Sequence, residues 1–211
     1  MTHLTLYGSK GSGSAAVEMA LQAIGLKYHT IRASEWEPDS AKSELLRVNP
    51  LGQIPTLVLP DGSVLTESAA ILINLGLDYP GHHILPDPPS RRAMVIRGLT
   101  FIAANCYSAV SVSDYPERWT TAKTKQAHAR VRTAARLQLY RSWDIFFDTF
   151  TAELESTKSE PGALAFLAVV VSRWSGTRAH LETSNKEAVK LLSRMEAHPR
   201  IATVLAEHSA T

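Results

Sequence analysis

The spacing of hydrophobic residues changes near residue 80, and this change limits the fold more than any other feature of the chain. Before it, short apolar runs are separated by glycine and proline turn signals, which predicts strands and short helices. After it, apolar residues recur only at helical spacing. Residues 80–89 contain four prolines and are expected to link the two parts. The sequence therefore predicts an α/β N-terminal domain over 1–79 and an all-α C-terminal domain over 90–208.

The front part is expected to alternate strands with helices. Gly25 is the expected C-cap of the first helix, and Pro60-Asp61-Gly62 is a turn signal that makes a hairpin of the last two strands. The order is therefore βαβ, helix, ββα. The predicted strands are Leu4–Tyr7, Tyr28–Ile31, Ile54–Leu59 and Val64–Leu65, and the predicted helices are 15–24, Ser40–Val48 and Ser68–Leu77.

The back part is expected to contain helices alone. Two long ones are marked by apolar stripes over 93–110 and 131–150, and two shorter ones cover Leu164–Trp174 and Lys186–Ala197. The last of these is expected to stop before His198-Pro199, since proline disfavours helix at the residue before it.

Composition excludes several classes of protein. A formal net charge of +2 argues against a dedicated nucleic-acid binder. The single cysteine, Cys106, rules out an internal disulfide and a multi-cysteine metal site. The longest apolar run, Leu164–Val171, is far short of the roughly 20 residues that span a bilayer, and the first residues lack the features of a secretory signal. We therefore expect a soluble cytoplasmic protein that binds no membrane and no metal.

The segment Asn49–Ala70 carries the most specific chemistry. A proline directly before a strand tolerates a cis bond, and such a bond at Ile54-Pro55 turns the chain so that the main chain of Ile54 is free to pair with an extended peptide. Glu67 and Ser68 open a helix, whose first N–H groups attract a carboxylate, while Glu67 offers a counter-charge for an amine. A small peptide with an amine and a carboxylate, such as glutathione, suits this set.

These residues resemble the glutathione transferase superfamily, whose glutathione site has the pattern N-P-x-G-x-[IV]-P followed by [ES]-S. The resemblance implies a thioredoxin-like front domain in which Ile54, next to Pro55, pairs with the cysteinyl group. It also implies that Glu67 and Ser68 hold the γ-glutamyl end, assisted by Gln53, and that Trp36 borders the glycyl end. A homodimer follows from it, with glutathione as co-substrate and a small hydrophobic electrophile as the second substrate. The alternative is that the proline serves shape alone and that Glu67-Ser68 is only a helix start.

The residue that acts on the glutathione sulfur is less well specified. A transferase must favour the thiolate, which a hydroxyl donor near a helix N-terminus does. The loop before the first helix holds three serines and no cysteine, which departs from the beta-type bacterial members of the family. We rank Ser12 first, then Ser14, then Ser9, with Tyr7 last. Each has a structural alternative; Ser14, for example, suits the N-cap of the helix that follows. The other alternative is that backbone N–H groups alone stabilise the thiolate.

The acceptor side and the exact reaction are open. Phe101, Asn105 and Ser108 on the first long helix are expected to line the acceptor pocket. Transfer of glutathione to a small electrophile is the leading function. A glutathione-dependent reductase or peroxidase, a non-catalytic glutathione-binding protein and a partner-binding role without any ligand remain alternatives.

One stretch of the back part departs from the family pattern. The helix after the two long ones commonly begins with a Ser/Thr-x-x-Asp capping box, but the matching run here is Ala163-Leu164-Ala165-Phe166. Either another group caps this helix, or the back part is less conventional than the front.

Overall fold

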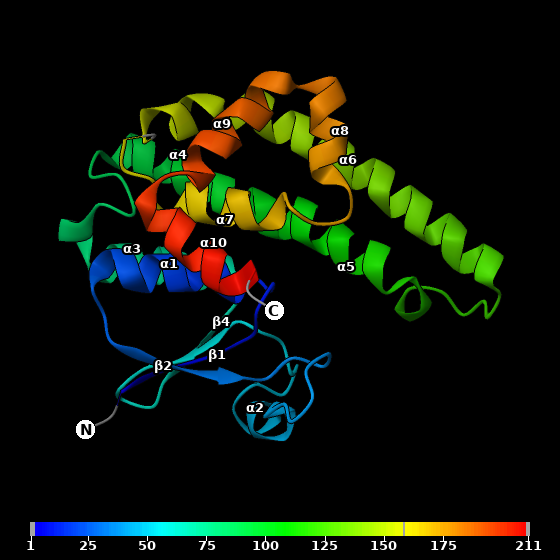
Figure 1. Ribbon diagram of the computed structural model, residues 1–211, viewed down its shortest axis with the longest axis horizontal. Helices are drawn as coiled ribbons and strands as arrows, with labels where there is room; N and C mark the ends of the chain where they lie inside the picture. The colour runs from blue at the N-terminus through cyan, green and yellow to red at the C-terminus, as the bar shows by residue number, and fades with distance from the viewer. Residues whose placement is uncertain (1–2, 158, 210–211) are drawn as a thin grey trace.

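The computed structural model describes residues 3–157 and 159–209. A small sheet lies on one side of the molecule and helices fill the other (Figure 1). The strands are β1 (Leu4–Gly8), β2 (Tyr28–Arg32), β3 (Thr56–Val58) and β4 (Val64–Thr66). Their order across the sheet is β2-β1-β3-β4, with β1 parallel to β2 and antiparallel to β3, and β3 antiparallel to β4. This mixed sheet confirms the predicted front part.

Helices cover both faces of the sheet. Helices α1 (Ser14–Ile24) and α3 (Ser68–Asp78) lie on the face toward the helical part, and α2 (Lys42–Val48) lies on the opposite face (Figure 1). On the α2 side, Leu45 packs with Tyr7 and Ala33 in a small core of its own. Gly25 ends α1 in the left-handed conformation, φ 78°, as predicted for a C-cap.

The helical part is built around two long helices. The first is continuous over Pro89–Asp114 and consists of α4 (Pro89–Phe101), a π-helical stretch η2 (Ile102–Tyr107) and α5 (Ser108–Asp114). It is long and apolar enough to cross a membrane by length and composition, a test that core helices also meet. Here its buried side chains, among them Leu99 and Ile102, face α6 (Lys125–Ser156) and α7 (Ala163–Val171) within the core.

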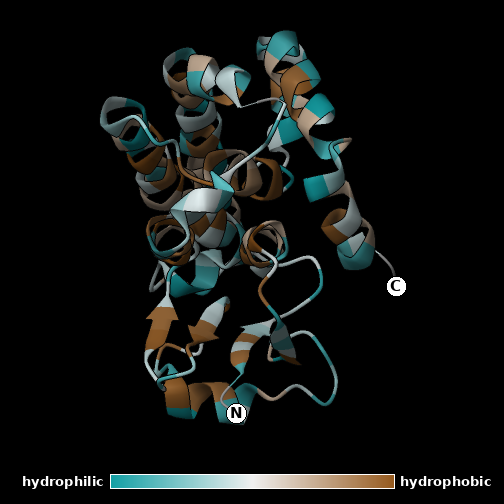
Figure 2. Cartoon of the chain, turned by 90° about the vertical axis from the view of Figure 1, so that its left-hand side faces the viewer, coloured by the Kyte–Doolittle hydropathy of each residue, from teal (hydrophilic) through white to brown (hydrophobic). Residues whose placement is uncertain are grey.

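Helix α7 is the centre of the core. All nine of its residues are buried, and it packs against α1 and α3 on one side and α4 on another. The main hydrophobic core is continuous across both parts, since Leu6 and Leu72 belong to the same cluster as Phe146 and Phe166. In Figure 2 the hydrophobic residues gather on the strands and the central helices, while the outer helices are more hydrophilic.

The missing capping box of α7 is replaced by a main-chain contact. No side chain caps the helix, but the N–H of Ala163 donates to the carbonyl oxygen of Ile84 at 2.9 Å. The neighbouring Gly162 permits this approach, because a Cβ there would lie 2.5 Å from the same oxygen. The segment after α3 therefore caps the central helix, so another group does the work of the absent side chains.

Several elements differ from the sequence prediction. Strand β3 begins at Thr56, two residues later than expected, because Ile54 and Pro55 belong to the turn. The predicted linker holds a 3-10 turn, η1 (Pro80–His82), and a second such turn, η3 (Pro116–Arg118), follows α5. Helix α9 (Lys186–Glu196) was predicted, whereas α8 (Thr177–Ser184) and α10 (Pro199–Ser209) were not. Helix α10 packs against α1 (Figure 1).

Candidate functional site

A cavity of about 560 Å³ opens between the front domain and the long helix of the back part. Loops at the ends of β1, β2, β3 and β4 supply one wall, and η2, α5 and the segment after α5 supply the other. The front residues that line it are Gly11, Ser12, Gly13, Ala33, Ser34, Glu35, Trp36, Lys42, Leu51, Gly52, Gln53, Ile54, Pro55, Thr66, Glu67 and Ser68. The back residues are Ala103, Tyr107, Ser108, Val110, Ser111, Asp114, Tyr115, Arg118, Trp119 and Trp174.

The turn before β3 is held by the buried side chain of Asn49. Its Nδ2 donates to the carbonyl oxygen of Gln53 at 3.1 Å and to Oγ1 of Thr56 at 2.9 Å, while its Oδ1 accepts from the N–H of Leu51 at 3.1 Å. The Ile54-Pro55 bond is cis, as the sequence led us to expect. Because β3 starts at Thr56, the main chain of Ile54 lies outside the ladder, and Ile54 is one of the residues that border the cavity.

Glu67 has an unusual backbone conformation beside this turn. The pairing of Thr56 with Thr66 brings Glu67 next to Pro55, at the point where the hairpin ends and α3 begins. Its φ of 61° and ψ of 111° are costly for a residue with a side chain. No side chain caps α3, so the N–H groups at its first turn, beside the buried Ser68, are available to an anion in the cavity.

The three serines of the loop before α1 lie in different surroundings. Ser12 alone among them borders the cavity, and its Oγ donates to the carbonyl oxygen of Ser9 at 2.8 Å. Ser14 is fully buried and is the first residue of α1 rather than its N-cap, a position that Gly13 takes. Ser9 is also buried, and its Oγ donates to the carboxylate of Glu37 at 2.5 Å.

Tyr7, ranked last from the sequence, points away from the cavity. Its hydroxyl donates to Oε1 of Glu44 on α2 at 2.6 Å. Burial, together with this carboxylate, raises the pKa of Tyr7 to about 12.

The sequence interpretation missed Tyr107, which brings a hydroxyl from the back part to the front loop. A Cβ built on Gly13 would lie only 2.8 Å from this hydroxyl oxygen, so the phenol covers the start of α1. Its ring packs edge-on against Trp174, with the ring centroids 5.3 Å apart. Burial, with the negative charge of Glu67 as a second cause, raises the pKa of Tyr107 to about 12. The phenol therefore stays protonated at neutral pH and can act as a hydrogen-bond donor.

Of the three residues expected to line an acceptor pocket, one borders the cavity. Ser108 lines it, but Phe101 and Asn105 do not. The ring of Phe101 packs on Phe146 and Phe150 in the core, and Nδ2 of Asn105 donates to the carbonyl oxygen of Phe101 at 3.2 Å. The π-helical stretch adds a residue to the turn, which changes the face that the helix presents after Phe101.

Charged and aromatic side chains surround the mouth of the cavity. Glu35 accepts an ion pair from Lys42 at 3.1 Å and another from Arg118, across the mouth, at 3.3 Å. The hydrogen bond and charge of Lys42, followed by those of Arg118, hold the pKa of Glu35 below its usual value. Trp36 and Trp119 are more than half exposed here, at 57% and 58%. Lys42 and Trp36 both line the cavity.

Cys106 and His83 are not among the residues that line this cavity. Cys106 is fully buried in the core, and burial raises the pKa of its thiol. His83 pairs with Asp87 at 3.1 Å. Within residues 3–157 and 159–209, no group of three or more His, Cys, Asp or Glu side chains is arranged as metal ligands.

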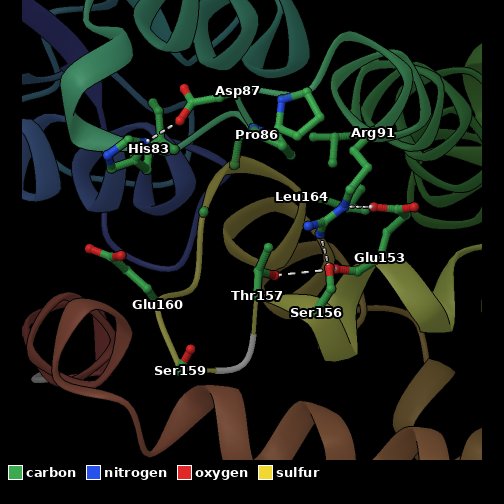
Figure 3. A pocket seen from close by; sticks show the side chains of 15 residues that line it. His83, Pro86, Asp87, Arg91, Glu153, Ser156, Thr157, Ser159, Glu160 and Leu164 are labelled. Carbon is green, nitrogen blue, oxygen red and sulfur yellow. Dashed lines mark hydrogen bonds and ion pairs between the residues drawn. The ribbon is translucent and has the colours of Figure 1, made fainter.

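A smaller cavity of about 260 Å³ lies where the linker meets α4 and α6 (Figure 3), and Glu67 is not among the residues that line it. Its polar side chains pair with protein groups: Arg91 binds Glu153 and Ser156, and Glu160 pairs with Arg200. These pairs stabilise the junction and leave the larger cavity as the candidate site.

Comparison with known proteins bears on both the front domain and the whole fold. Residues 14–78 match the family model "Glutathione S-transferase, N-terminal domain". The chain is 33% identical over 129 residues to the uncharacterized GST-like protein YncG of Escherichia coli, covering 61% of this chain and 62% of that protein. It is 34% identical over 114 residues to glutathione S-transferase D7 of Drosophila melanogaster, covering 53% and 50%. The matches thus span about half to three fifths of these relatives.

The fold extends to complete solved structures. A glutathione transferase homolog from Sulfitobacter, crystallised with bound glutathione, superposes with a TM-score of 0.83 over 100% of both chains at 21% identity. At that identity the likeness shows a shared fold.

Proposed function

This chain belongs to the glutathione transferase superfamily, and on that premise we propose that it binds glutathione in the 560 Å³ cavity and transfers the thiolate to a small electrophile. One observation carries the binding proposal. Glu67, held at a φ of 61°, and the main chain of Ile54 border the same cavity beside an uncapped helix start. A strained, charged residue at such a point is typical of a ligand clamp.

The arrangement supports one direction for the tripeptide. Glu67 would pair with the α-amine, and Ser68 with the first N–H groups of α3 would bind the α-carboxylate. The main chain of Ile54 would pair with the cysteinyl residue in the manner of an added strand, beside Pro55 and Gln53. The glycyl carboxylate would then lie toward Lys42 and Trp36 at the mouth.

The sulfur would lie at the start of α1, close to two hydroxyl groups. Ser12 lines the cavity, and Tyr107 covers Gly13. A hydrogen bond donated to the sulfur and the positive end of α1 both favour the thiolate over the thiol. Ser12 would have to turn its proton from the carbonyl oxygen of Ser9, whereas the Tyr107 hydroxyl already lies over Gly13. We therefore place both Ser12 and Tyr107 at the sulfur, with Ser14 and Ser9 supporting the loop.

The remaining space supports an apolar second substrate. Val110, Tyr115 and the rings of Trp119 and Trp174 line the side of the cavity opposite the front loops. Aromatic faces of this kind favour flat or hydrophobic electrophiles.

We also propose that the protein is a homodimer, as its family membership implies, and that it works in the cytoplasm in the detoxification of electrophiles. Leu51, which is 70% exposed next to the cavity, and Leu77, which is 52% exposed, are large apolar surface groups of the kind that interfaces cover. Light scattering after gel filtration gives the mass; a mass of one chain at micromolar concentration contradicts the dimer.

Calorimetric titration with glutathione tests the binding proposal. We expect wild-type protein to bind and Glu67→Gln to bind at least about tenfold more weakly, because a charge-assisted hydrogen bond contributes about 1.5–3 kcal/mol. Glu182→Gln, an exposed carboxylate on α8 outside the cavity, is the matched control and should bind as wild type does. Absence of binding to the wild-type protein would refute the proposal and favour a role without ligand.

Turnover assays then separate the reactions. Loss of glutathione thiol with a nitro-activated aryl halide is the expected result for transfer. Turnover of an organic hydroperoxide without conjugation of the aryl halide would replace transfer by a peroxidase function. Tight binding with no turnover of either compound would identify a non-catalytic glutathione-binding protein.

A further inference from the structure

A chain of hydrogen bonds joins the last helix of the protein to the loop at the sulfur end of the cavity. On α10, His208 Nε2 lies 2.9 Å from Oε1 of Glu18, and its Nδ1 accepts from the N–H of Gly11 at 3.2 Å. Gly11 borders the cavity together with Ser12. The two contacts therefore connect a helix of the back part with both α1 and the loop that precedes it.

The contacts indicate the roles of the two imidazole nitrogens. Because Nδ1 accepts a hydrogen bond from a main-chain N–H, the proton of the ring is on Nε2, where it is donated to the Glu18 carboxylate. Both side chains are enclosed, with only 8% of His208 and 10% of Glu18 exposed. Gly11 has a φ of 71°, a conformation that favours glycine, and it is this residue whose N–H contacts the imidazole.

Glu18 carries the connection on to the serines. Its Oε1 also accepts from Oγ of Ser14 at 3.1 Å, and the N–H of Ser14 donates to Oγ of Ser12 at 3.2 Å. Ser14 Oγ additionally accepts from the N–H of Ser9 at 3.3 Å. Starting from His208, one continuous set of hydrogen bonds thus reaches the single loop serine that borders the cavity.

We infer that His208 is a positioning residue for the thiolate. It holds the loop of Gly11 and Ser12 against α1, so that the Ser12 hydroxyl and the start of α1 face the sulfur. This role rests on the proposed function, since it concerns the geometry at a bound glutathione. It predicts that the contact with Gly11 serves catalysis, whereas the contact with Glu18 mainly serves stability by giving a buried carboxylate its partner.

Two substitutions separate these contacts. In His208→Asn the amide oxygen takes the place of Nδ1 and keeps the acceptor for Gly11, but the donor to Glu18 is lost. In His208→Gln the amide nitrogen takes the place of Nε2 and keeps the donor to Glu18, but the acceptor for Gly11 is lost. The exposed His29 on β2, changed in the same two ways, is the matched control.

The expected results run in opposite directions for activity and stability. His208→Gln should lower kcat by roughly tenfold, because a displaced reacting group loses alignment, while the glutathione dissociation constant stays that of wild type. The pKa of the bound thiol, followed by thiolate absorbance against pH, should rise in His208→Gln and stay near wild type in His208→Asn. The melting temperature should be lower for His208→Asn than for His208→Gln, because only the Asn variant loses the donor to Glu18.

A measurement without glutathione tests the loop contact by itself. Hydrogen exchange of the peptide that contains Gly11 should be faster in His208→Gln than in wild type, and nearly unchanged in His208→Asn.

Equal exchange in the two variants would overturn the proposed loop contact. A thiol titration that is unchanged in both, measured where both are folded, would overturn the positioning role while glutathione binding stands. Failure of the wild-type protein to bind glutathione would overturn the proposed function itself. The exchange measurement, made without glutathione, would still test the loop contact in that case.

Discussion

The strained backbone at Glu67 predicts that a glycine there makes the protein more stable than an alanine does. A non-glycine residue in a sparsely populated region such as φ 61°, ψ 111° costs about 1–3 kcal/mol. Glycine removes this cost but loses about 0.5–1 kcal/mol more conformational entropy on folding. Glu67→Gly and Glu67→Ala both remove the carboxylate, so their difference isolates the backbone. We expect Glu67→Gly to have the larger free energy of unfolding, by about 1 kcal/mol.

Urea denaturation at neutral pH, with the thermal midpoint as a second measure, gives this difference. For a chain of 211 residues, about 1 kcal/mol corresponds to a shift of roughly 2–4 °C in the midpoint. Both variants should bind glutathione more weakly than the wild-type protein, since each lacks the proposed partner of the α-amine. The Gly variant would thus be more stable than the Ala variant and equally poor at binding.

Two results would refute this reasoning. Equal free energies of unfolding for the Gly and Ala variants would mean that the backbone at Glu67 relaxes without cost. Wild-type affinity for glutathione in either variant would mean that the Glu67 carboxylate takes no part in binding, and that the strain serves only the junction of β4 with α3.

Three further changes test other parts of the structure. Tyr107→Phe should raise the pKa of the bound glutathione thiol by about one to two units, since a hydrogen bond to a charge contributes about 1.5–3 kcal/mol; thiolate absorbance measures it. Gly162→Ala should lower the free energy of unfolding by roughly 1–3 kcal/mol, because its methyl group meets the Ile84 carbonyl, whereas Gly81→Ala, in open space, should not. The pKa of Tyr7 is raised to about 12, so its contribution to the free energy of unfolding is complete below pH 10 and is lost between pH 10 and 12. In Tyr7→Phe the free energy of unfolding should therefore fall less steeply with pH over that range.

The front domain was predictable because its signals are local. Alternation in Leu4–Tyr7, the turn Pro60-Asp61-Gly62 and the helix end at Gly25 each depend on a few neighbouring residues. The turn before β3 is also local, because Asn49 makes its hydrogen bonds within seven residues. The position of Ile54 and of Glu67 beside the cavity followed from the same short segment.

The helices that the sequence left out had weaker or misleading signals. Pro199 was taken as the end of the preceding helix, and it is also the first residue of α10, a position that proline favours. Helix α8 is short and largely polar, with only Thr177 and Leu181 buried, so it offers no apolar stripe. It packs against α9, which follows it directly, and against α6, which is distant in the chain and whose position relative to α8 the sequence alone does not give.

The surroundings proposed for the sulfur were not predictable for a related reason: they are made by contacts between parts far apart in the sequence. Gly13 has the appearance of an ordinary loop glycine, yet it is the phenol of Tyr107, 94 positions later, that leaves no room for a side chain there. Gly11 is likewise constrained by His208 from the last helix. The proposed binding groups of the front domain lie within one short segment, but the proposed geometry at the sulfur depends on how the helical part packs onto that domain. Substitutions in α10 or η2 should therefore alter turnover with little effect on glutathione affinity.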